Sequence, residues 1–305
     1  MTATTSVLIM GYGAFGRALF HALEPNEGLA ISVYRRTPNA DTDPLSAAAI
    51  YHDLPGVPLD RFDIVLVAVP SYAVEETVGA LPLRRDGRDP VFISCAKGID
   101  SATGLFPSAL LARLTASRRY GALSGPSFTD EMVAGKRTMV AVATPDLDLA
   151  RSVSARLQTT GFRLEPTDDV NGLQFCSVAK NIIALGAGIS DALSYGENYR
   201  AAFVARGVVE LTDLLPRLGG QAKTLHSIGG LGDILLTCVS PRSRNYRMGF
   251  AIGSRGSSET IMSEGLSSAT AFVRYLEGQG IFSPYFERIV AAIDRPESIG
   301  DLLND

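Results

Sequence analysis

Three glycines close to the N-terminus constrain the fold of this chain more than any other feature. Gly11, Gly13 and Gly16 directly follow a short apolar run at 6–10, and apolar residues then recur at helical spacing in 17–23. A strand, a glycine turn and a helix in this order make up the unit that binds dinucleotides. Gly11 permits the tight turn, Gly13 lets the backbone approach a pyrophosphate, and Gly16 lets the helix pack against the strand. We therefore predict a nucleotide site here, with the pyrophosphate at the helix N-terminus, rather than a merely flexible turn.

The rest of the sequence divides into an α/β part and a helical part. Further strands are expected at 30–34, 63–69, 91–95, 120–124, 139–143 and 162–165. The run 63–69 is apolar throughout, as is usual for a parallel strand buried on both faces. After Pro166 the strand pattern fades, and helical spacing continues from a long apolar helix at 170–189 to a helix at 283–293. We predict an α/β chain with an N-terminal Rossmann-type dinucleotide-binding domain at 1–166, followed by an all-α substrate and catalytic domain at 167–305.

The end of the second predicted strand bears on the choice of cofactor. In NAD-binding domains an acidic residue at this place binds the ribose 2′-hydroxyl, but here Tyr34 is followed by Arg35 and Arg36. A missing carboxylate with a guanidinium in its place is typical of proteins that bind the 2′-phosphate of NADP. The alternative is an ordinary pair of surface arginines. We predict that NADP is the preferred cofactor and NAD the second choice.

Two lysines are candidate site residues. Lys180 stands within the apolar helix predicted at 170–189. Burial disfavours the charged form of a lysine and brings its pKa toward the range in which it can exchange protons. The alternative is a side chain that extends along the apolar surface until its ammonium group reaches water. Lys97 follows the strand at 91–95, and the ligands of parallel sheets bind beyond the carboxyl ends of the strands.

The segment 229–245 combines a carboxylate with side chains that suit a phosphate. Asp233 lies at a glycine-rich turn that opens an apolar helical run, and this run ends at Pro241. A polar cluster of two arginines, a serine and an asparagine follows at 242–245. A guanidinium beside hydroxyl and amide donors suits a dianionic phosphate, because it presents several donors in a planar fork. The alternative is a helix C-terminus that carries solvated charges.

Composition and charge argue against several classes of protein. The chain carries 28 basic and 32 acidic side chains and no basic block, so we expect no nucleic-acid partner. Its 3 cysteines and 3 histidines lack the spacing of a metal site, and we expect no metal. No signal peptide and no apolar run of membrane-spanning length are evident, so we expect a cytoplasmic protein without a membrane span. The helix at 170–189 is apolar nearly all round, which indicates burial at an interface and a homodimer.

The motifs taken together resemble one family over nearly the whole chain. They are, in order, Gly11-Tyr-Gly-Ala-Phe-Gly16, Val69-Pro-Ser71, Ala96-Lys-Gly98, Gly125-Pro-Ser-Phe128, Lys180-Asn181, Gly196-Glu-Asn198, Ala205-Arg-Gly-Val-Val-Glu210, Gly229 to Cys238, Ser243-Arg-Asn245 and Glu264-Gly265. In this order they resemble the bacterial type of the NAD(P)-dependent glycerol-3-phosphate dehydrogenase family. The last blocks are far more specific than the glycine fingerprint. The resemblance implies an oxidoreductase that interconverts dihydroxyacetone phosphate and sn-glycerol 3-phosphate by hydride transfer with NAD(P)H.

The resemblance also implies roles for individual residues. Lys180 takes the proton of the substrate hydroxyl during oxidation and returns it during reduction, Lys97 contacts substrate and cofactor, and Asp233 contacts the substrate and helps to order the lysines. These three are the candidate catalytic residues. The implied substrate contacts are Lys97, Gly125, Ser127, Lys180, Asp233, Ser243, Arg244 and Asn245. The candidate cofactor contacts are Gly11, Gly13, Ala14, Phe15, Gly16, Arg35, Arg36, Lys97, Thr129, Arg244, Met262 and Glu264.

The sequence departs from the family pattern in several places. Tyr12 stands where the family usually has alanine, Arg17 stands where it often has threonine, the stretch 37–61 is short, and 225–231 follows an unusual pattern. These departures bear on substrate and cofactor preference more than on reaction type. Two alternatives stay open: a hydroxyacid or ketopantoate-type NADP-dependent reductase of the same two-domain plan, and a regulatory protein that binds NADP without turnover. A preference for NADPH would point toward glycerol 3-phosphate synthesis for phospholipids.

Overall fold

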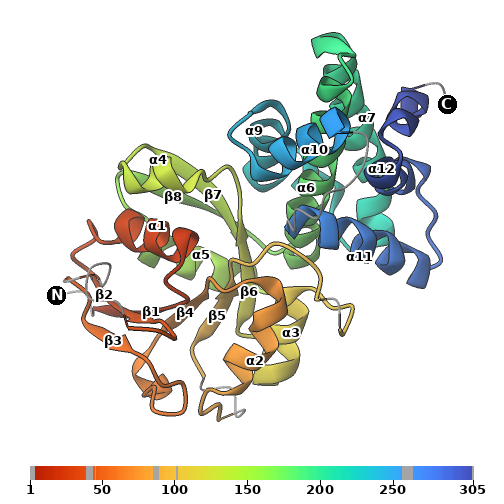
Figure 1. Ribbon diagram of the computed structural model, residues 1–305. Helices are drawn as coiled ribbons and strands as arrows, with labels where there is room; N and C mark the ends of the chain where they lie inside the picture. Colours follow the sequence, from red (N-terminus) through yellow and green to blue (C-terminus); the bar gives the residue numbers. More distant parts are fainter. Residues whose placement is uncertain are drawn as a thin grey trace. The chain divides into compact units, whose positions relative to one another are not determined.

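The computed structural model describes residues 4–38, 44, 46–84, 89–100, 102–255 and 264–303. The chain divides into two compact units, drawn in Figure 1. The first comprises Met1–Lys97 and Leu105–Val170, and the second comprises Gly98–Gly104 and Asn171–Asp305. A Rossmann-type part followed by a helical part is the predicted fold class, which is confirmed. The boundary between domains at 166/167 stays a prediction.

Within the described residues, the first unit contains one eight-stranded sheet with the order β3-β2-β1-β4-β5-β6-β7-β8. Its strands are β1 (Thr5–Met10), β2 (Leu29–Tyr34), β3 (Ala49–Tyr51), β4 (Ile64–Val67), β5 (Val91–Ser94), β6 (Tyr120–Ser124), β7 (Thr138–Ala143) and β8 (Phe162–Thr167). Neighbouring strands run parallel except β6 and β7, which run antiparallel. The parallel strands from β3 to β6 therefore all end at the same edge of the sheet. The short edge strand β3 was not among the strands predicted.

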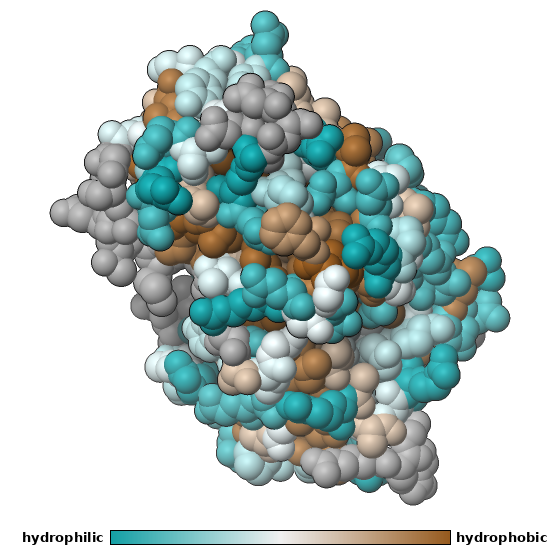
Figure 2. Space-filling model, turned by 90° about the vertical axis from the view of Figure 1, so that its right-hand side faces the viewer, coloured by the Kyte–Doolittle hydropathy of each residue, from teal (hydrophilic) through white to brown (hydrophobic). Residues whose placement is uncertain are grey.

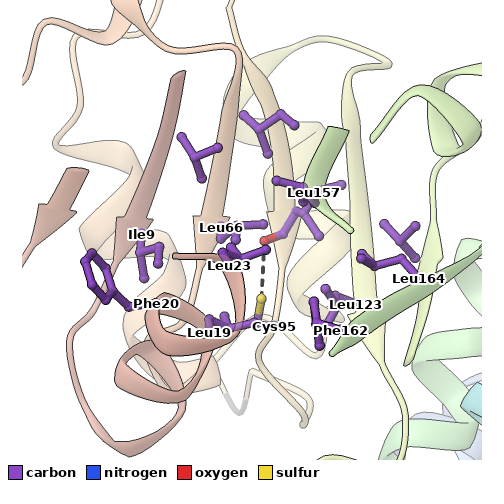
Figure 3. Close-up of a cluster of buried hydrophobic side chains, with 14 of the residues drawn as sticks. Ile9, Leu19, Phe20, Leu23, Leu66, Cys95, Leu123, Leu157, Phe162 and Leu164 are labelled. Carbon is purple, nitrogen blue, oxygen red and sulfur yellow. Dashed lines mark hydrogen bonds between the residues drawn. The ribbon is translucent and has the colours of Figure 1, made fainter. Parts of the chain in front are cut away.

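Alternate residues of the strands face opposite helical layers. Val7 and Ile9 belong to one core cluster with side chains of α1, α4 and α5, whereas Leu8 and Met10 belong to a second cluster with side chains of α2 and α3. Figure 3 shows part of the first cluster, in which Cys95 lies among leucine and phenylalanine side chains. Both faces of the sheet are thus covered, which is why its central strands are apolar throughout. These helices are α1 (Ala14–Leu23), α2 (Val74–Gly79), α3 (Pro107–Thr115), α4 (Thr129–Val133) and α5 (Leu147–Leu157).

Helices form the second unit, and α6 is its central one. The α-helices are α6 (Val170–Ala192), α7 (Gly196–Arg217), α8 (Ala222–Leu225), α9 (Asp233–Val239), α10 (Arg244–Arg255), α11 (Glu264–Gly278) and α12 (Pro284–Asp294). Within the described residues, α6 is the one helix long and apolar enough to cross a membrane, so the expectation that no run reaches this length is wrong. Its most apolar 18-residue stretch is completely buried, however, which makes α6 a core helix of this unit.

Glycines allow α6 and α10 to pack backbone against backbone. A Cβ atom on Gly188 of α6 would lie 2.0 Å from the carbonyl oxygen of Tyr246, and one on Gly249 of α10 would lie 1.9 Å from that of Leu185. No side chain fits at either position, so only glycine permits this approach. The sequence did not lead us to expect α10, because glycines stand where an apolar stripe would otherwise mark a helix. Figure 1 shows α10 beside α6.

Candidate active site

The glycine turn after β1 has the geometry of an anion-binding site. Gly11 has a φ of +96°, and a Cβ atom there would lie 2.8 Å from Val69. A Cβ atom on Gly16 would lie 1.9 Å from the carbonyl oxygen of Gly11, whereas one on Gly13 would have no atom within 4 Å. Gly13 is exposed and precedes α1, which begins at Ala14 without a side-chain cap. The first-turn N–H groups of this ten-residue helix thus lack a side-chain cap and can bind an anion.

The two predicted cofactor arginines lie beside this turn. The Gly11 N–H donates to the carbonyl oxygen of Tyr34 at 3.0 Å, which joins the turn to the end of β2. Arg35 is half-buried and Arg36 is exposed, directly after that strand. The Arg35 guanidinium lies 6.0 Å from the centre of the Tyr12 ring, within range of a cation–π interaction. Arg35 therefore lies beside the glycine turn in the first unit, and Arg36 is the next residue along the chain.

The remaining site residues of the first unit follow β5 and β6 at the same sheet edge. Lys97 is half-buried after β5, and Gly125 follows β6 with a φ of +153°. A Cβ atom on Gly125 would lie 2.8 Å from the Cα atom of Val140, so this position also requires glycine. The hydroxyl group of Ser127 donates to the carbonyl oxygen of Gly125 at 2.8 Å, and Thr129 opens α4. The structure therefore brings these positions to the edge that carries the glycine turn.

In the second unit, Lys180 forms a buried ion pair with Asp233. Their Nζ and Oδ1 atoms lie 2.5 Å apart, and the side chains are only 6% and 1% exposed. The Lys180 ammonium also donates to the hydroxyl oxygen of Thr237 at 3.2 Å. Lys180 does not extend to water, so the alternative of a solvated ammonium is wrong. Two buried opposite charges are expensive to desolvate, and removal of one of them strongly destabilises the protein. Buried ionisable groups of this kind are common in functional sites.

The local sequence explains how Asp233 reaches this position. A π-helical turn at Ile228–Gly232 precedes α9, and Asp233 is the first residue of that helix. A Cβ atom on Gly230 would lie 2.4 Å from the carbonyl oxygen of Thr224, so the turn requires glycine. Thr237 stands one helical turn after Asp233, and its hydroxyl group donates to the Asp233 carbonyl oxygen at 2.6 Å. Sequence reasoning missed Thr237, although its four-residue spacing from Asp233 was a usable signal.

The predicted phosphate cluster opens a helix rather than closing one. Helix α9 ends at Val239, and Ser243 precedes α10, which begins at Arg244. The buried Ser243 hydroxyl oxygen accepts from the Tyr246 N–H at 3.3 Å, as a helix cap does. Arg244 is exposed and Asn245 is half-buried in the first turn. The alternative of a helix C-terminus is therefore wrong, and the helix dipole adds to the attraction of the guanidinium for anions.

Two predicted cofactor contacts lie at the margin of what the structure describes. Met262 falls outside the described residues. Glu264 is the first residue of α11, and its side chain is also outside the described part.

Among the described residues, no group of three histidine, cysteine, aspartate or glutamate side chains could hold a metal ion.

The cysteines near the candidate residues are buried and unbridged. Burial raises the pKa of the Cys95 thiol to about 12, although the nearby Lys97 ammonium lowers it. Burial also raises the pKa of Cys238, whose sulfur lies 3.6 Å from the carbonyl oxygen of Lys180. Both are thus neutral thiols near neutral pH, and neither offers the thiolate that a nucleophile requires.

Comparisons with known proteins bear on the family of this chain. The descriptions "NAD-dependent glycerol-3-phosphate dehydrogenase N-terminus" and "C-terminus" belong to the family models that match residues 6–150 and 169–304. A glycerol-3-phosphate dehydrogenase [NAD(P)+] of Paracoccus denitrificans is 38% identical over 92% of this chain and 90% of its own length. The crystal structure of a glycerol-3-phosphate dehydrogenase from Coxiella burnetii has a TM-score of 0.86 and 26% identity, covering 99% of both chains.

A more distant likeness shows the fold alone. A 3-hydroxyisobutyrate dehydrogenase of Mycobacterium tuberculosis has a TM-score of 0.56 at 14% identity, covering 98% of this chain and 99% of its own. Coverage is similar for the two kinds of solved structure, but the sequence identity and the TM-score are both higher for the glycerol-3-phosphate dehydrogenase of Coxiella burnetii. By the two family models and by its full-length relatives, this chain belongs to the NAD-dependent glycerol-3-phosphate dehydrogenase family.

Proposed function

We propose that this chain interconverts dihydroxyacetone phosphate and sn-glycerol 3-phosphate, with NAD(P)H as hydride donor. The observation that carries the proposal is the buried Lys180–Asp233 pair, with Thr237 as its third member, in a chain of this family. A lysine ammonium held by a buried carboxylate can donate a proton to the oxygen atom of a bound substrate. The name of the Paracoccus relative states the same activity for that protein.

The geometry of the glycine turn supports the proposal that a dinucleotide pyrophosphate binds there. Gly13 is open where a side chain would obstruct the phosphate, and the N-terminus of α1 faces the same space. We propose that Gly11, Gly13, Ala14, Phe15 and Gly16 hold the cofactor there. A bound nicotinamide supplies a hydride for reduction of the substrate carbonyl carbon, or accepts it in the reverse reaction.

Lys180 is proposed to carry the proton. When the carbonyl carbon gains a hydride, its oxygen must gain a proton, and the Lys180 ammonium is a donor with three N–H groups. Asp233 and Thr237 both accept hydrogen bonds from this ammonium, which fixes the position of its nitrogen atom. In the reverse reaction the neutral amine takes the hydroxyl proton. Asp233 then stabilises the ammonium that forms, because an opposite charge at this distance favours the charged state.

The phosphate of the substrate is proposed to lie at the first turn of α10. Arg244 and Asn245 supply side-chain donors, and the helix N-terminus supplies backbone N–H groups. Ser243 is a further proposed substrate contact, and as the buried cap of the helix it also holds the turn. Lys97, Gly125 and Ser127 of the first unit are further proposed substrate contacts, and Lys97, Thr129, Arg244, Met262 and Glu264 further cofactor contacts.

NADP is proposed as the preferred cofactor. Arg35 and Arg36 stand beside the glycine turn, where a 2′-phosphate requires positive charge. The Tyr12 ring supports the Arg35 guanidinium from one side, and Tyr12 also meets Phe20 edge to face at 6.0 Å. The His52 ring nitrogen lies 2.9 Å from the Arg35 carbonyl oxygen, which ties this segment to the residue after β3. Tyr12, which replaces the usual small residue, thus acts as a platform for the arginine.

A cytoplasmic homodimer is proposed as the working form. Figure 2 shows apolar atoms reaching one face of the molecule in patches among hydrophilic ones. In the second unit, large apolar side chains that are exposed include Val209, Leu235, Val239, Phe250 and Phe282. Exposed apolar patches favour association with another protein surface. Sedimentation equilibrium of the purified protein distinguishes a dimer from a monomer.

Turnover of three substrates tests the proposed reaction. NADPH oxidation is followed with dihydroxyacetone phosphate, with unphosphorylated dihydroxyacetone and with ketopantoate. Rapid turnover is expected for the phosphorylated ketone, slow turnover for unphosphorylated dihydroxyacetone and none for ketopantoate, because only the first substrate engages the first turn of α10. Turnover of ketopantoate alone would assign the chain to the hydroxyacid reductases instead, and NADPH binding without any turnover would assign it a regulatory role.

A further inference from the structure

A polar network outside the Lys180 pair joins three helices of the second unit. The Asp191 carboxylate, near the end of α6, accepts from the Arg200 guanidinium of α7 and from the Tyr246 hydroxyl group of α10. The Asp191 and Arg200 side chains are 12% and 19% exposed, and Tyr246 is 8% exposed. A carboxylate this far from water needs such partners, because an unpaired buried charge is strongly destabilising.

Tyr246 connects this network to the proposed phosphate site. It is the third residue of α10 and directly follows Arg244 and Asn245. Its backbone N–H donates to the Ser243 hydroxyl oxygen, and its carbonyl oxygen lies 2.0 Å from where a Cβ atom on Gly188 would stand. The first turn of α10 is therefore held at three points: by its cap, by its backbone contact with α6, and by the Tyr246 hydroxyl group.

The same helix that receives Tyr246 also carries Lys180. Lys180 and Asp191 lie on α6, a continuous helix of 23 residues, so their separation is fixed by the helix itself. A bond from Asp191 to Tyr246 thus sets the first turn of α10 relative to the lysine. A substrate whose phosphate and hydroxyl group are separated by a fixed number of bonds requires both binding points to be held at a fixed distance.

We propose that Asp191, Arg200 and Tyr246 are positioning residues, which hold Arg244 and Asn245 in place for the substrate phosphate. Arg200 neutralises Asp191, and Asp191 orients Tyr246. Burial and the bond to Asp191 raise the pKa of Tyr246, so its hydroxyl group remains a donor at neutral pH. The inference rests on the proposed function, because it assumes that α10 receives a phosphate.

The replacement Tyr246→Phe tests this inference with little disturbance. It removes one hydroxyl group and keeps the ring, and the Asp191–Arg200 pair remains to satisfy the carboxylate. We expect kcat/KM for dihydroxyacetone phosphate to fall roughly tenfold, mainly through KM, as for loss of a hydrogen bond to a charged group. The kcat/KM for unphosphorylated dihydroxyacetone and the Kd for NADPH should stay unchanged. If Tyr246 had a merely structural role, the replacement would lower kcat/KM for both substrates alike.

Tyr199→Phe is the matched control. Tyr199 lies next to Arg200, and its hydroxyl group donates to the Ile299 carbonyl oxygen at 2.6 Å, outside the network. This variant should leave the ratio of the two kcat/KM values unchanged. An unchanged ratio in Tyr246→Phe, or an equal change in Tyr199→Phe, overturns the inference.

Two further experiments distinguish failure of this inference from misfolding of the variant and from failure of the proposed function. If Tyr246→Phe does not fold, Arg200→Lys replaces it, since lysine keeps the charge beside Asp191 but loses the planar fork. The same selective loss for the phosphorylated substrate is then expected, and an unchanged ratio contradicts the inference. Absence of dihydroxyacetone phosphate turnover by the unaltered protein would instead overturn the proposed function.

Discussion

The glycine turn of the first unit and the lysine site of the second are built in opposite ways. The turn depends on side chains that are absent: Gly16 leaves room for the Gly11 carbonyl oxygen, and Gly13 leaves open space for a ligand. The lysine site depends on side chains that are present and buried, with Lys180 and Asp233 neutralising each other. The first presents backbone N–H groups, and the second presents an ammonium group.

This difference teaches where each site is vulnerable. A backbone site is disturbed by adding atoms close to the backbone, and it depends less on the neighbouring side chains. A site of paired buried charges is disturbed by removing atoms, because each partner is then left without compensation. Substitutions can therefore test the two sites by opposite changes in volume and charge.

The largest effect is expected at the lysine site. Lys180→Ala should lower kcat by about 10²–10⁴-fold, the usual contribution of a proton donor, and leave the Kd for NADPH nearly intact. It should also destabilise the protein by about 3–5 kcal/mol, because Asp233 is left buried and charged. Steady-state kinetics, NADPH titration and denaturant unfolding measure the three quantities.

A double variant separates chemistry from stability in this prediction. Lys180→Met combined with Asp233→Asn removes both charges and should recover much of the lost stability, but no activity. Near-normal kcat in Lys180→Ala would show that the proton comes from another group.

The second effect concerns the glycine turn, where two equal additions should differ. Gly16→Ala places a Cβ atom 1.9 Å from the Gly11 carbonyl oxygen and should abolish NADPH binding by distorting the turn. Gly13→Ala meets no protein atom within 4 Å and should leave the thermal midpoint unchanged, yet weaken NADPH binding roughly tenfold. NADPH titration and thermal unfolding check both variants. Unchanged binding in Gly13→Ala would mean that the cofactor does not approach the turn.

A smaller effect is expected for the two arginines of the first unit, whose side chains are proposed to bind the 2′-phosphate of the cofactor. Arg35→Ala and Arg36→Ala together should narrow the preference for NADPH over NADH by about tenfold, because each guanidinium makes charge-assisted bonds to the 2′-phosphate. The ratio of kcat/KM values for the two cofactors measures this preference. An equal ratio before and after would reduce both arginines to surface charge.

Tyr12 supplies the control for the arginine pair. Tyr12→Ala should narrow the preference by only a few-fold, since a cation–π contact of this kind is worth about 0.5–1 kcal/mol. Tyr12→Phe retains the ring and should keep the full preference.

The smallest effect at neutral pH is expected for a buried thiol, that of Cys95 in the first unit. Burial raises the pKa of Cys95 from 9.0 to about 12. The neutral thiol therefore stabilises the folded state fully below pH 9, and this contribution is lost as pH rises toward 12. The urea midpoint should fall between pH 8 and pH 10, and Cys95→Ala should reduce that fall. A midpoint independent of pH would show that water reaches the thiol.

Some parts of this molecule follow from sequence because they are local. The strand, glycine turn and helix at residues 5–23 lie in one short stretch, and the parallel strands are marked by continuous apolar runs. The edge strand β3 and helix α10 were not expected, because three residues carry little pattern and glycines interrupt the apolar stripe of α10. Sequence motifs marked Lys180, Asp233 and Arg244 as candidate site residues, but the motifs did not predict which residues these side chains contact.

The sequence by itself determined the fold class, the family and the glycine positions of the nucleotide turn. Only the tertiary structure decided that Lys180 is buried against Asp233, 53 positions away, that Thr237 joins them, and that Arg244 opens a helix. It also decided that Asp191 holds Tyr246 across 55 positions. The physical reason is that local propensity and periodicity act over a few residues, whereas burial and charge pairing depend on which helices meet. Helices α6 and α10 meet because glycines on both remove the side chains that would keep them apart.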